Sequence, residues 1–455
     1  HPNFTSAAQK LKDFHFNKDG SKCKIVTPQE IYNEFSSGKQ DISSIRDYCR
    51  YLYNLNNSTF KYLLILGDAS YDPKDRVSNN TNFVITYQST NSYSPLNTFS
   101  TDDYFGYLDD HEGLLQNDLV DIGIGRLPAK TLTEANIMVD KIINYHDKST
   151  RGSWRNMACF IADDGDDSDG NIHMSQADDL CNIIDNNYNN YNFEKPYLDI
   201  YNQESPPIGP RSEDCKNAID RRIDKGTLLV NYTGHGGEKG LTNERIVEID
   251  QILDWDNYDK LPLFVTATCE FGRLDNPELT SGGEHIILNP NGGGVALLTT
   301  TRYVYSHLNY NLNTNFINSL FEKIEGKYPT LGDVFLQTKV LSGTSINSNK
   351  FTLLGDPMMS LAYPKHIVRT TSFPDTISAL GKVTFTGEII SEDSVLINDF
   401  DGEIEIIVFD KEKIAQTQGQ QSSTPMDYKK QTNIIYKGRS SVLNGVFTFS
   451  FIVPK

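Results

Sequence analysis

Six short apolar runs rich in β-forming residues recur along the chain, and amphipathic stretches separate them. The runs span residues 61–68, 120–128, 156–163, 227–233, 262–268 and 294–301, and the main candidate helices span 41–55, 131–146, 174–187 and 310–324. Strands that lie between helices and are buried on both faces show this pattern. We therefore expect an α/β fold with mainly parallel sheets.

The character of the sequence changes after Pro364. Helical periodicity ends there, and short alternating runs at 382–387, 402–409 and 445–453 are separated by polar turns. This pattern predicts a β-sandwich of immunoglobulin type. Because a new strand opens after a long helix near residue 150, we expect three domains, with boundaries at 1–150, 151–364 and 365–455.

The charge and composition exclude some classes of partner. With 42 Lys and Arg against 60 Asp and Glu, the net charge is −18, which opposes binding to nucleic acid or to an anionic membrane face. No apolar run approaches the roughly 18 residues of a membrane helix. The chain has six cysteines, namely Cys23, Cys49, Cys159, Cys181, Cys215 and Cys269. They lack the spacing of a zinc ribbon and are too few for a disulfide scaffold.

Two of the apolar runs end in residues that can carry chemistry. Residues 227–237 (TLLVNYTGHGG) place His235 after a strand, and residues 262–272 (PLFVTATCEFG) place Cys269 after the next one. Neighbouring parallel strands end at the same edge, where ligands and catalytic groups collect in open α/β sheets. Each residue alone has a plain interpretation, a turn histidine and a small buried hydrophobe. Together they indicate a base and a nucleophile.

Several motifs resemble the gingipain family of caspase-like cysteine peptidases. They are YTGHG at 232–236, TATCEFG at 266–272, LLGDP at 353–357, LILGD at 64–68 and IGRLPA at 124–129. The resemblance covers about residues 1–364 and implies a caspase-like catalytic domain of two α/β subdomains followed by an immunoglobulin-like β-sandwich. It also implies His235 as the catalytic histidine, Cys269 as the nucleophile, and the backbone N–H groups of Gly236 and Cys269 as the oxyanion hole. Since the family has its first strand just before the position of His1, we expect a longer parent protein.

The family carries an acidic residue that orients the histidine, and here Asp164 falls at that place in IADDGDDSDG. Three neighbouring aspartates compete for the role, namely Asp163, Asp166 and Asp167. The plain alternative for this acidic segment is a solvated loop.

Calcium is the second alternative for the acidic segment, because gingipains bind calcium. The EF-hand pattern fails here: Gly170 in the sixth place would put Gly165 in the first, and Gln176 replaces the terminal glutamate. We expect no required cofactor, and structural calcium in another geometry stays open.

The substrate pocket can be outlined in the same way. Arginine-specific gingipains have an aspartate at the base of the pocket, and the matching residue here is Asn171. The absence of that carboxylate argues against arginine specificity. The segment that follows the strand at 294–301 supplies four candidates for the pocket wall, namely Arg302, Tyr303, Tyr305 and Ser306. The alternative is that this segment is an ordinary polar loop.

Other catalytic motifs are absent from the sequence. There is no GxxxxGK[ST], HExxH or GxSxG pattern. His173, His285 and His307 lack mutual ligand spacing, so we interpret them as surface or loop histidines.

Within the family, TATCEFG and LTSGGE (279–284) are most similar to the C-terminal-signal peptidases of type IX secretion. The resemblance implies a cysteine endopeptidase on the outer-membrane surface of a Gram-negative bacterium, which removes C-terminal sorting domains and passes the acyl group either to water or to a surface glycolipid. Its partners would be cargo with sorting domains, attachment-complex proteins such as PorV, and lipopolysaccharide, with no nucleic acid. The alternatives are a secreted gingipain-like protease and an idle caspase-like adhesion or scaffold module.

Overall fold

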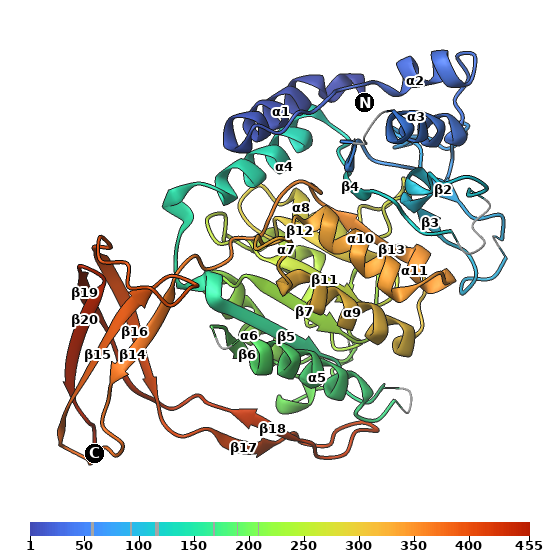
Figure 1. Ribbon diagram of the computed structural model, residues 1–455. Helices are drawn as coiled ribbons and strands as arrows, with labels where there is room; N and C mark the ends of the chain where they lie inside the picture. Colours follow the sequence, from blue (N-terminus) through green and yellow to red (C-terminus); the bar gives the residue numbers. More distant parts are fainter. Residues whose placement is uncertain (56–58, 92, 114–117, 167–168, 189, 208) are drawn as a thin grey trace. The chain divides into compact units, whose positions relative to one another are not determined.

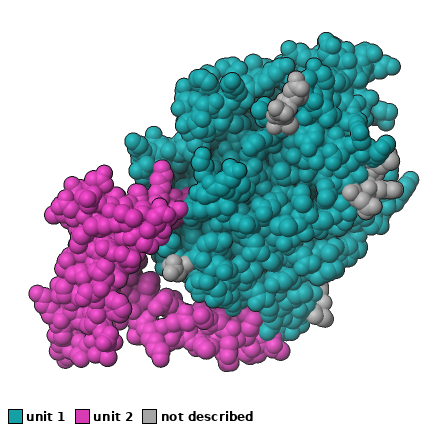
Figure 2. Space-filling view, in the orientation of Figure 1, with its two compact units in different colours: residues 1–362, 420–423 teal, residues 363–419, 424–455 magenta. Residues whose placement is uncertain are grey.

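The computed structural model describes residues 1–455 except 56–58, 92, 114–117, 167–168, 189 and 208 (Figure 1). The chain forms two compact units, which Figure 2 shows in different colours. Unit 1 comprises residues 1–362 and 420–423, and unit 2 comprises residues 363–419 and 424–455. None of the described helices is long and apolar enough to cross a membrane.

An eight-stranded sheet forms the centre of unit 1, in the order β1-β4-β13-β12-β11-β7-β5-β6. Its strands are β1 (Tyr62–Leu66), β4 (Gly123–Leu127), β13 (Phe351–Leu354), β12 (Ala296–Thr300), β11 (Leu263–Ala267), β7 (Leu229–Thr233), β5 (Met157–Ala162) and β6 (Asn192–Glu194). All neighbours are parallel except β12 and β13, which are antiparallel. The central strands β7, β11 and β12 are buried at every residue, so the predicted strands buried on both faces are confirmed.

The α-helices of the described residues all belong to unit 1. They are α1 (Thr5–Asp19), α2 (Pro28–Phe35), α3 (Ile42–Asn54), α4 (Leu132–Tyr145), α5 (Ile172–Asn187), α6 (Glu213–Lys225), α7 (Ile249–Asp254), α8 (Gly282–Leu288), α9 (Ser306–Phe321), α10 (Leu331–Ser342) and α11 (Ile346–Lys350). Helices α2, α4, α8 and α10 each begin with a capping box, in which a Ser or Thr side chain accepts a hydrogen bond from the third backbone N–H of the helix. Helix α5 packs on β5 and β7, and α9 packs on α5 and β11.

Short strand pairs complete unit 1. They are β2 (Tyr87–Gln88) with β3 (Ser100–Thr101), and β8 (Gly236–Gly237) with β9 (Gly240–Leu241) and β10 (Val247–Glu248). The boundary expected near residue 150 lies inside this unit, because β1 and β4 belong to the same sheet as the strands that follow. The subdomain division at that point stays a prediction.

Unit 2 is antiparallel and fits an immunoglobulin-like domain. Five strands pair in the order β14-β15-β20-β19-β16, namely β14 (Ile367–Ser372), β15 (Lys382–Ile390), β20 (Val446–Ile452), β19 (Ile434–Leu443) and β16 (Gly402–Phe409). A separate pair joins β17 (Lys413–Gln416) to β18 (Asp427–Lys430). Aromatic rings stack nearly parallel on the sheet, with Phe385 and Phe449 5.0 Å apart and Tyr436 and Phe451 4.5 Å apart between centroids.

Candidate active site

The turn after β7 fixes the backbone of His235. Its N–H donates to Oδ2 of Asp163 at 2.9 Å, and its carbonyl accepts from the Tyr232 hydroxyl at 2.5 Å and the Thr242 N–H at 3.1 Å. The preceding residue must be glycine, because Gly234 has φ +156° and an added Cβ would lie 2.3 Å from Cβ of Asp163. The imidazole therefore leaves the strand end in a defined direction.

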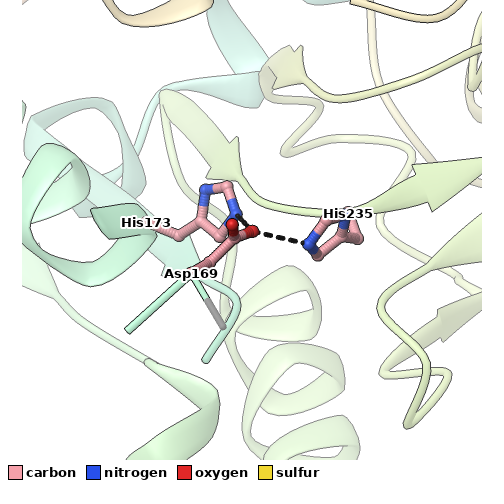
Figure 3. Close-up of side chains that lie close together, drawn as sticks. All are labelled: Asp169, His173 and His235. Carbon is pink, nitrogen blue, oxygen red and sulfur yellow. Dashed lines mark hydrogen bonds and ion pairs between the residues drawn. The ribbon is translucent and has the colours of Figure 1, made fainter. Parts of the chain in front are cut away.

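The imidazole of His235 is bonded to Asp169 (Figure 3). Nε2 of His235 lies 2.9 Å from Oδ2 of Asp169, and Nε2 of His173 lies 3.2 Å from the same oxygen. The His235 and Asp169 side chains are 40% and 36% exposed, whereas His173 is buried. Burial, together with the neighbouring His235, lowers the pKa of His173 to about 4, so this ring is neutral at physiological pH.

Cys269 lies two residues after β11. Its sulfur accepts a hydrogen bond from the backbone N–H of Val304 at 3.5 Å. Burial raises the pKa of the Cys269 thiol, and the Val304 N–H offsets only part of that effect. The free enzyme therefore holds this residue mainly as a thiol at neutral pH, and a base is required to make it a nucleophile.

His235 and Cys269 lie at the same edge of the sheet. β7 and β11 are parallel neighbours, and their last residues face each other in register. The two following loops also touch, because a Cβ on Gly236 would lie 2.6 Å from Oγ1 of Thr268. Among the described residues, no hydrogen bond joins the imidazole of His235 to the sulfur of Cys269.

Asp164 does not bond to His235 in this structure, which corrects the expected geometry. Oδ2 of Asp164 accepts from Nε2 of Gln203 at 2.5 Å, and the side chain is fully buried. The carboxylate that contacts the imidazole belongs to Asp169. The sequence analysis missed this residue, although Asp169 and His173 stand four positions apart at the start of a helix, a spacing at which side chains meet.

The other aspartates of the segment have separate places. Asp163 supports the backbone of His235 rather than its ring. Oδ2 of Asp166 accepts from Nδ2 of Asn243 at 2.7 Å. Asp167 lies outside the described residues.

Arg302 is held by a buried carboxylate. Its guanidinium binds Asp275 with two hydrogen bonds of 2.7 and 2.5 Å, and both side chains are buried. A bidentate pair of this kind fixes the chain after β12. Arg302 is thus buried in a pair with Asp275, and its place in the pocket wall stays a prediction.

The remaining wall candidates are accessible or partly so. Tyr303 and Tyr305 are 44% and 45% exposed. The hydroxyl of Ser306 lies 3.4 Å from Nε2 of Gln176. Asn171 stands immediately before α5. These two tyrosines flank Val304, whose backbone N–H bonds to the Cys269 sulfur, and their exposed rings offer a surface for uncharged side chains.

The histidines also differ from expectation. His173 is buried on α5 and bonded to Asp169, so its interpretation as a surface or loop histidine is wrong. His285 lies on α8 and is partly buried, and His307 is exposed on α9. His235 lies 66 positions after Asp169 in the sequence, so these two residues become neighbours only through the fold.

Residues Gln420–Ser423, called the tip segment below, contact both ends of the loop before α5. The Ser422 hydroxyl donates to the carbonyl of Gly165 and accepts from the N–H of Gly170 at 3.1 Å. The Ser423 hydroxyl donates to the carbonyl of Gly170 at 3.2 Å. Gly165 has no room for a side chain, since a Cβ there would lie 2.4 Å from the Ser423 nitrogen. The tip segment therefore fixes the loop that carries the carboxylate of the site.

Within the part of the chain that the structure describes, two groups of side chains have the geometry to hold a metal ion. One is Asp169, His173 and His235, and the other is a buried acidic cluster of Asp163, Asp164, Asp166 and Glu244. Burial raises the pKa of Asp164 to about 6 and that of Glu244 to about 7. Oδ1 of Asp164 and Oε2 of Glu244 are buried without a hydrogen-bond partner among the described residues. An all-oxygen cluster with two unpartnered oxygens fits a hard cation such as Ca²⁺.

The family model for peptidase family C25 matches residues 1–362. The chain belongs to this family of cysteine peptidases. It is a cysteine endopeptidase of gingipain type, so the expected family, fold class and enzyme class are confirmed.

Two solved gingipain structures support that fold. Gingipain R (RgpB), described as an Arg-specific cysteine proteinase, is 17% identical with a TM-score of 0.60 over 99% of this chain and 90% of that chain. The complex of Porphyromonas gingivalis RgpB pro- and mature domains gives 17% identity and a TM-score of 0.59 over 99% of this chain and 91% of that chain. Dimeric latent PorU from Porphyromonas gingivalis is 21% identical with a TM-score of 0.44, over 100% of this chain and 39% of that chain. A search of curated proteins gave no match.

Proposed function

We propose that this peptidase removes C-terminal sorting domains from cargo exported by a type IX secretion system. The hydrogen bond between His235 and Asp169, at the sheet edge that also carries Cys269, supports the chemistry. The similarity of TATCEFG and LTSGGE to C-terminal-signal peptidases such as PorU supports the choice of substrate.

The proposed reaction begins with proton transfer from Cys269 to His235. A carboxylate only accepts hydrogen bonds, so Nε2 of His235 carries a proton toward Asp169 and Nδ1 is the nitrogen left to act as the base. The thiolate attacks the scissile carbonyl carbon, and the backbone N–H groups of Gly236 and Cys269 hold the oxyanion. His235 then returns the proton to the leaving amine, and a thioester remains on Cys269.

The role of Asp169 in this scheme is orientation. Its carboxylate holds one tautomer of His235 and stabilises the imidazolium that forms during the reaction. The second bond, from Nε2 of His173, fixes the carboxylate in turn. Asp163 positions the same histidine through its backbone N–H.

The pocket supports a preference for uncharged residues before the cut. Asn171 offers an amide where an arginine-specific enzyme has a carboxylate. Two nearby carboxylates already have cationic partners, since Asp275 binds Arg302 and Glu270 lies 3.7 Å from Arg273. Burial of an unpaired guanidinium costs several kcal/mol. An enzyme that trims folded cargo at a linker benefits, because exposed arginines elsewhere are spared.

Further proposals follow from the same assignment. The thioester would pass its acyl group to water or to an amine of a surface lipopolysaccharide. Attachment-complex proteins such as PorV would present the cargo, and the site of action would be the outer-membrane surface. Calcium would be held by the acidic cluster, where it would neutralise buried carboxylates and take no part in the bond-making steps.

A peptide series that differs only at the residue before the cut tests this proposal. We expect faster cleavage of peptides with small or uncharged residues than of those with arginine, and release of an intact sorting domain from a recombinant cargo. Mass spectrometry of the new carboxyl end, with and without a glycolipid amine, separates hydrolysis from transfer. Strong arginine preference with degradation of the folded cargo would favour the alternative, a secreted gingipain-like protease.

A further inference from the structure

Asp169, His173 and His235 bring three potential metal-binding atoms within 4.8 Å of one another (Figure 3). The two ring nitrogens Nε2 approach the same oxygen, and the imidazole planes lie at 79° with centroids 5.2 Å apart. We propose that these three side chains form a binding site for a divalent transition-metal ion such as Zn²⁺, and that occupancy reversibly switches the peptidase off. The inhibitory part of this proposal rests on the proposed role of His235 as the base.

The distances are close to those of a tetrahedral site. Bonds of about 2.0–2.1 Å from zinc to nitrogen or oxygen place neighbouring ligand atoms roughly 3.3 Å apart. The two measured separations from Oδ2 of Asp169 are 2.9 and 3.2 Å, and all three ligand atoms lie within 4.8 Å of one another. Small side-chain rotations would therefore open the group enough to admit the ion.

The ligand chemistry selects the class of metal. Two imidazoles and a carboxylate suit zinc and its neighbours, whereas calcium and magnesium prefer sites made entirely of oxygen. A fourth position would remain open to water, as in other zinc sites with three protein ligands. Partial exposure of His235 and Asp169 gives the ion a route from solvent.

Metal binding changes which nitrogen of each neutral ring can carry a proton. Each Nε2 must offer its lone pair to the metal, so each ring proton moves to Nδ1. On His235 this blocks the nitrogen that would accept the thiol proton of Cys269. On His173 the proton arrives at an Nδ1 that is buried and has no partner among the described residues. That cost makes the site weaker than a structural zinc site, which suits reversible inhibition.

Metal binding can be measured without catalysis. In the full chain with Cys269→Ala, we expect one Co²⁺ per chain, with the visible absorption of tetrahedral nitrogen and oxygen ligation, and competition by Zn²⁺ in calorimetry. Adding His173→Gln should weaken binding at least tenfold, because glutamine keeps a hydrogen-bond donor for Asp169 but is a poor zinc ligand. The matched control, His285→Gln on α8, should bind as tightly as the parent. Equal affinity in the His173 and His285 variants would overturn the site.

Inhibition provides the second arm. With Cys269 intact, Zn²⁺ should inhibit cleavage. The Zn²⁺ concentration that halves the rate is measured for each variant against its own metal-free rate. We expect this concentration to rise at least tenfold in His173→Gln and to stay unchanged in His285→Gln. Zinc inhibition that persists equally in both variants would place the ion on Cys269 instead and refute the proposal. If Co²⁺ binds as expected but the wild-type chain cleaves no peptide, the proposed function fails and the metal site stands.

Discussion

His235 and Cys269 are positioned differently from Asp169. The histidine and the cysteine follow neighbouring parallel strands, whose register alone brings them to one edge of the sheet. Asp169 belongs to a loop whose end at Gly170 bonds to Ser422, 252 residues away in sequence. The proposed nucleophile and base thus depend on strand topology, and the orienting carboxylate depends on a long-range contact. Variants at the two kinds of position should therefore differ in the size and in the nature of their effects.

The largest effect is expected at the strand ends. Cys269→Ala should lower kcat/KM more than about a thousandfold, since no other group can form the thioester, and His235→Ala should be comparably damaging. Peptide cleavage and thermal unfolding should be measured together. Both variants should keep the unfolding temperature of the wild type, because a partly exposed residue beyond a strand adds little to the core. A Cys269→Ala enzyme with more than about a thousandth of the activity would rule out a sole nucleophile.

A smaller effect is expected at the orienting carboxylate. In a buried Ser-His-Asp triad, the Asp→Asn change costs about 10,000-fold. Asp169 is 36% exposed, so water can replace part of its action, and Asp169→Asn should lower kcat by roughly a hundredfold with little change in KM. Asp164→Asn is the matched control, and it should lower kcat by less than about tenfold, because Asp164 bonds to Gln203 rather than to the ring. Unchanged activity in Asp169→Asn together with a large loss in Asp164→Asn would make Asp164 the orienting carboxylate instead.

A still smaller effect is expected at the tip segment. Ser422→Ala removes the hydroxyl that bonds Gly165 and Gly170, a loss of about 1 kcal/mol for a typical hydrogen bond. If that order is needed to hold Asp169 in place, kcat should fall about fivefold. Ser440→Ala, which removes a single hydroxyl bond to a carbonyl in unit 2, should leave kcat unchanged. Equal rates for the two variants would mean that the loop is ordered without the tip segment.

The same distinction explains what could be predicted from sequence. The apolar runs and their spacing predict that the strands before His235 and Cys269 are parallel neighbours at the centre of the sheet. The two residues accordingly lie at the same edge of the sheet. The contact between Asp169 and His235, and the burial of Arg302 against Asp275, join residues from separate elements, and a local pattern does not encode such pairs. The antiparallel β13 was also missed, because it is only four residues long. The roles of the site residues stay predictions until variants are assayed.

The smallest predicted effect concerns the acidic cluster beneath the loop. The folded pKa values of Asp164 and Glu244 are about 6 and about 7, above their ordinary values of 3.8 and 4.5, so the folded chain binds more protons than the unfolded chain between those limits. These groups therefore favour folding at low pH, and that contribution is lost as the pH rises through 6 and 7.

Calcium needs ionised carboxylates, so it should restore stability mainly above neutral pH. We expect excess Ca²⁺ to raise the unfolding temperature by roughly 2 °C more at pH 8 than at pH 5.5 in scanning calorimetry. Glu244→Gln should remove most of that difference, and magnesium should not reproduce it. An equal gain at both pH values, or an unchanged response in Glu244→Gln, would place the ion elsewhere.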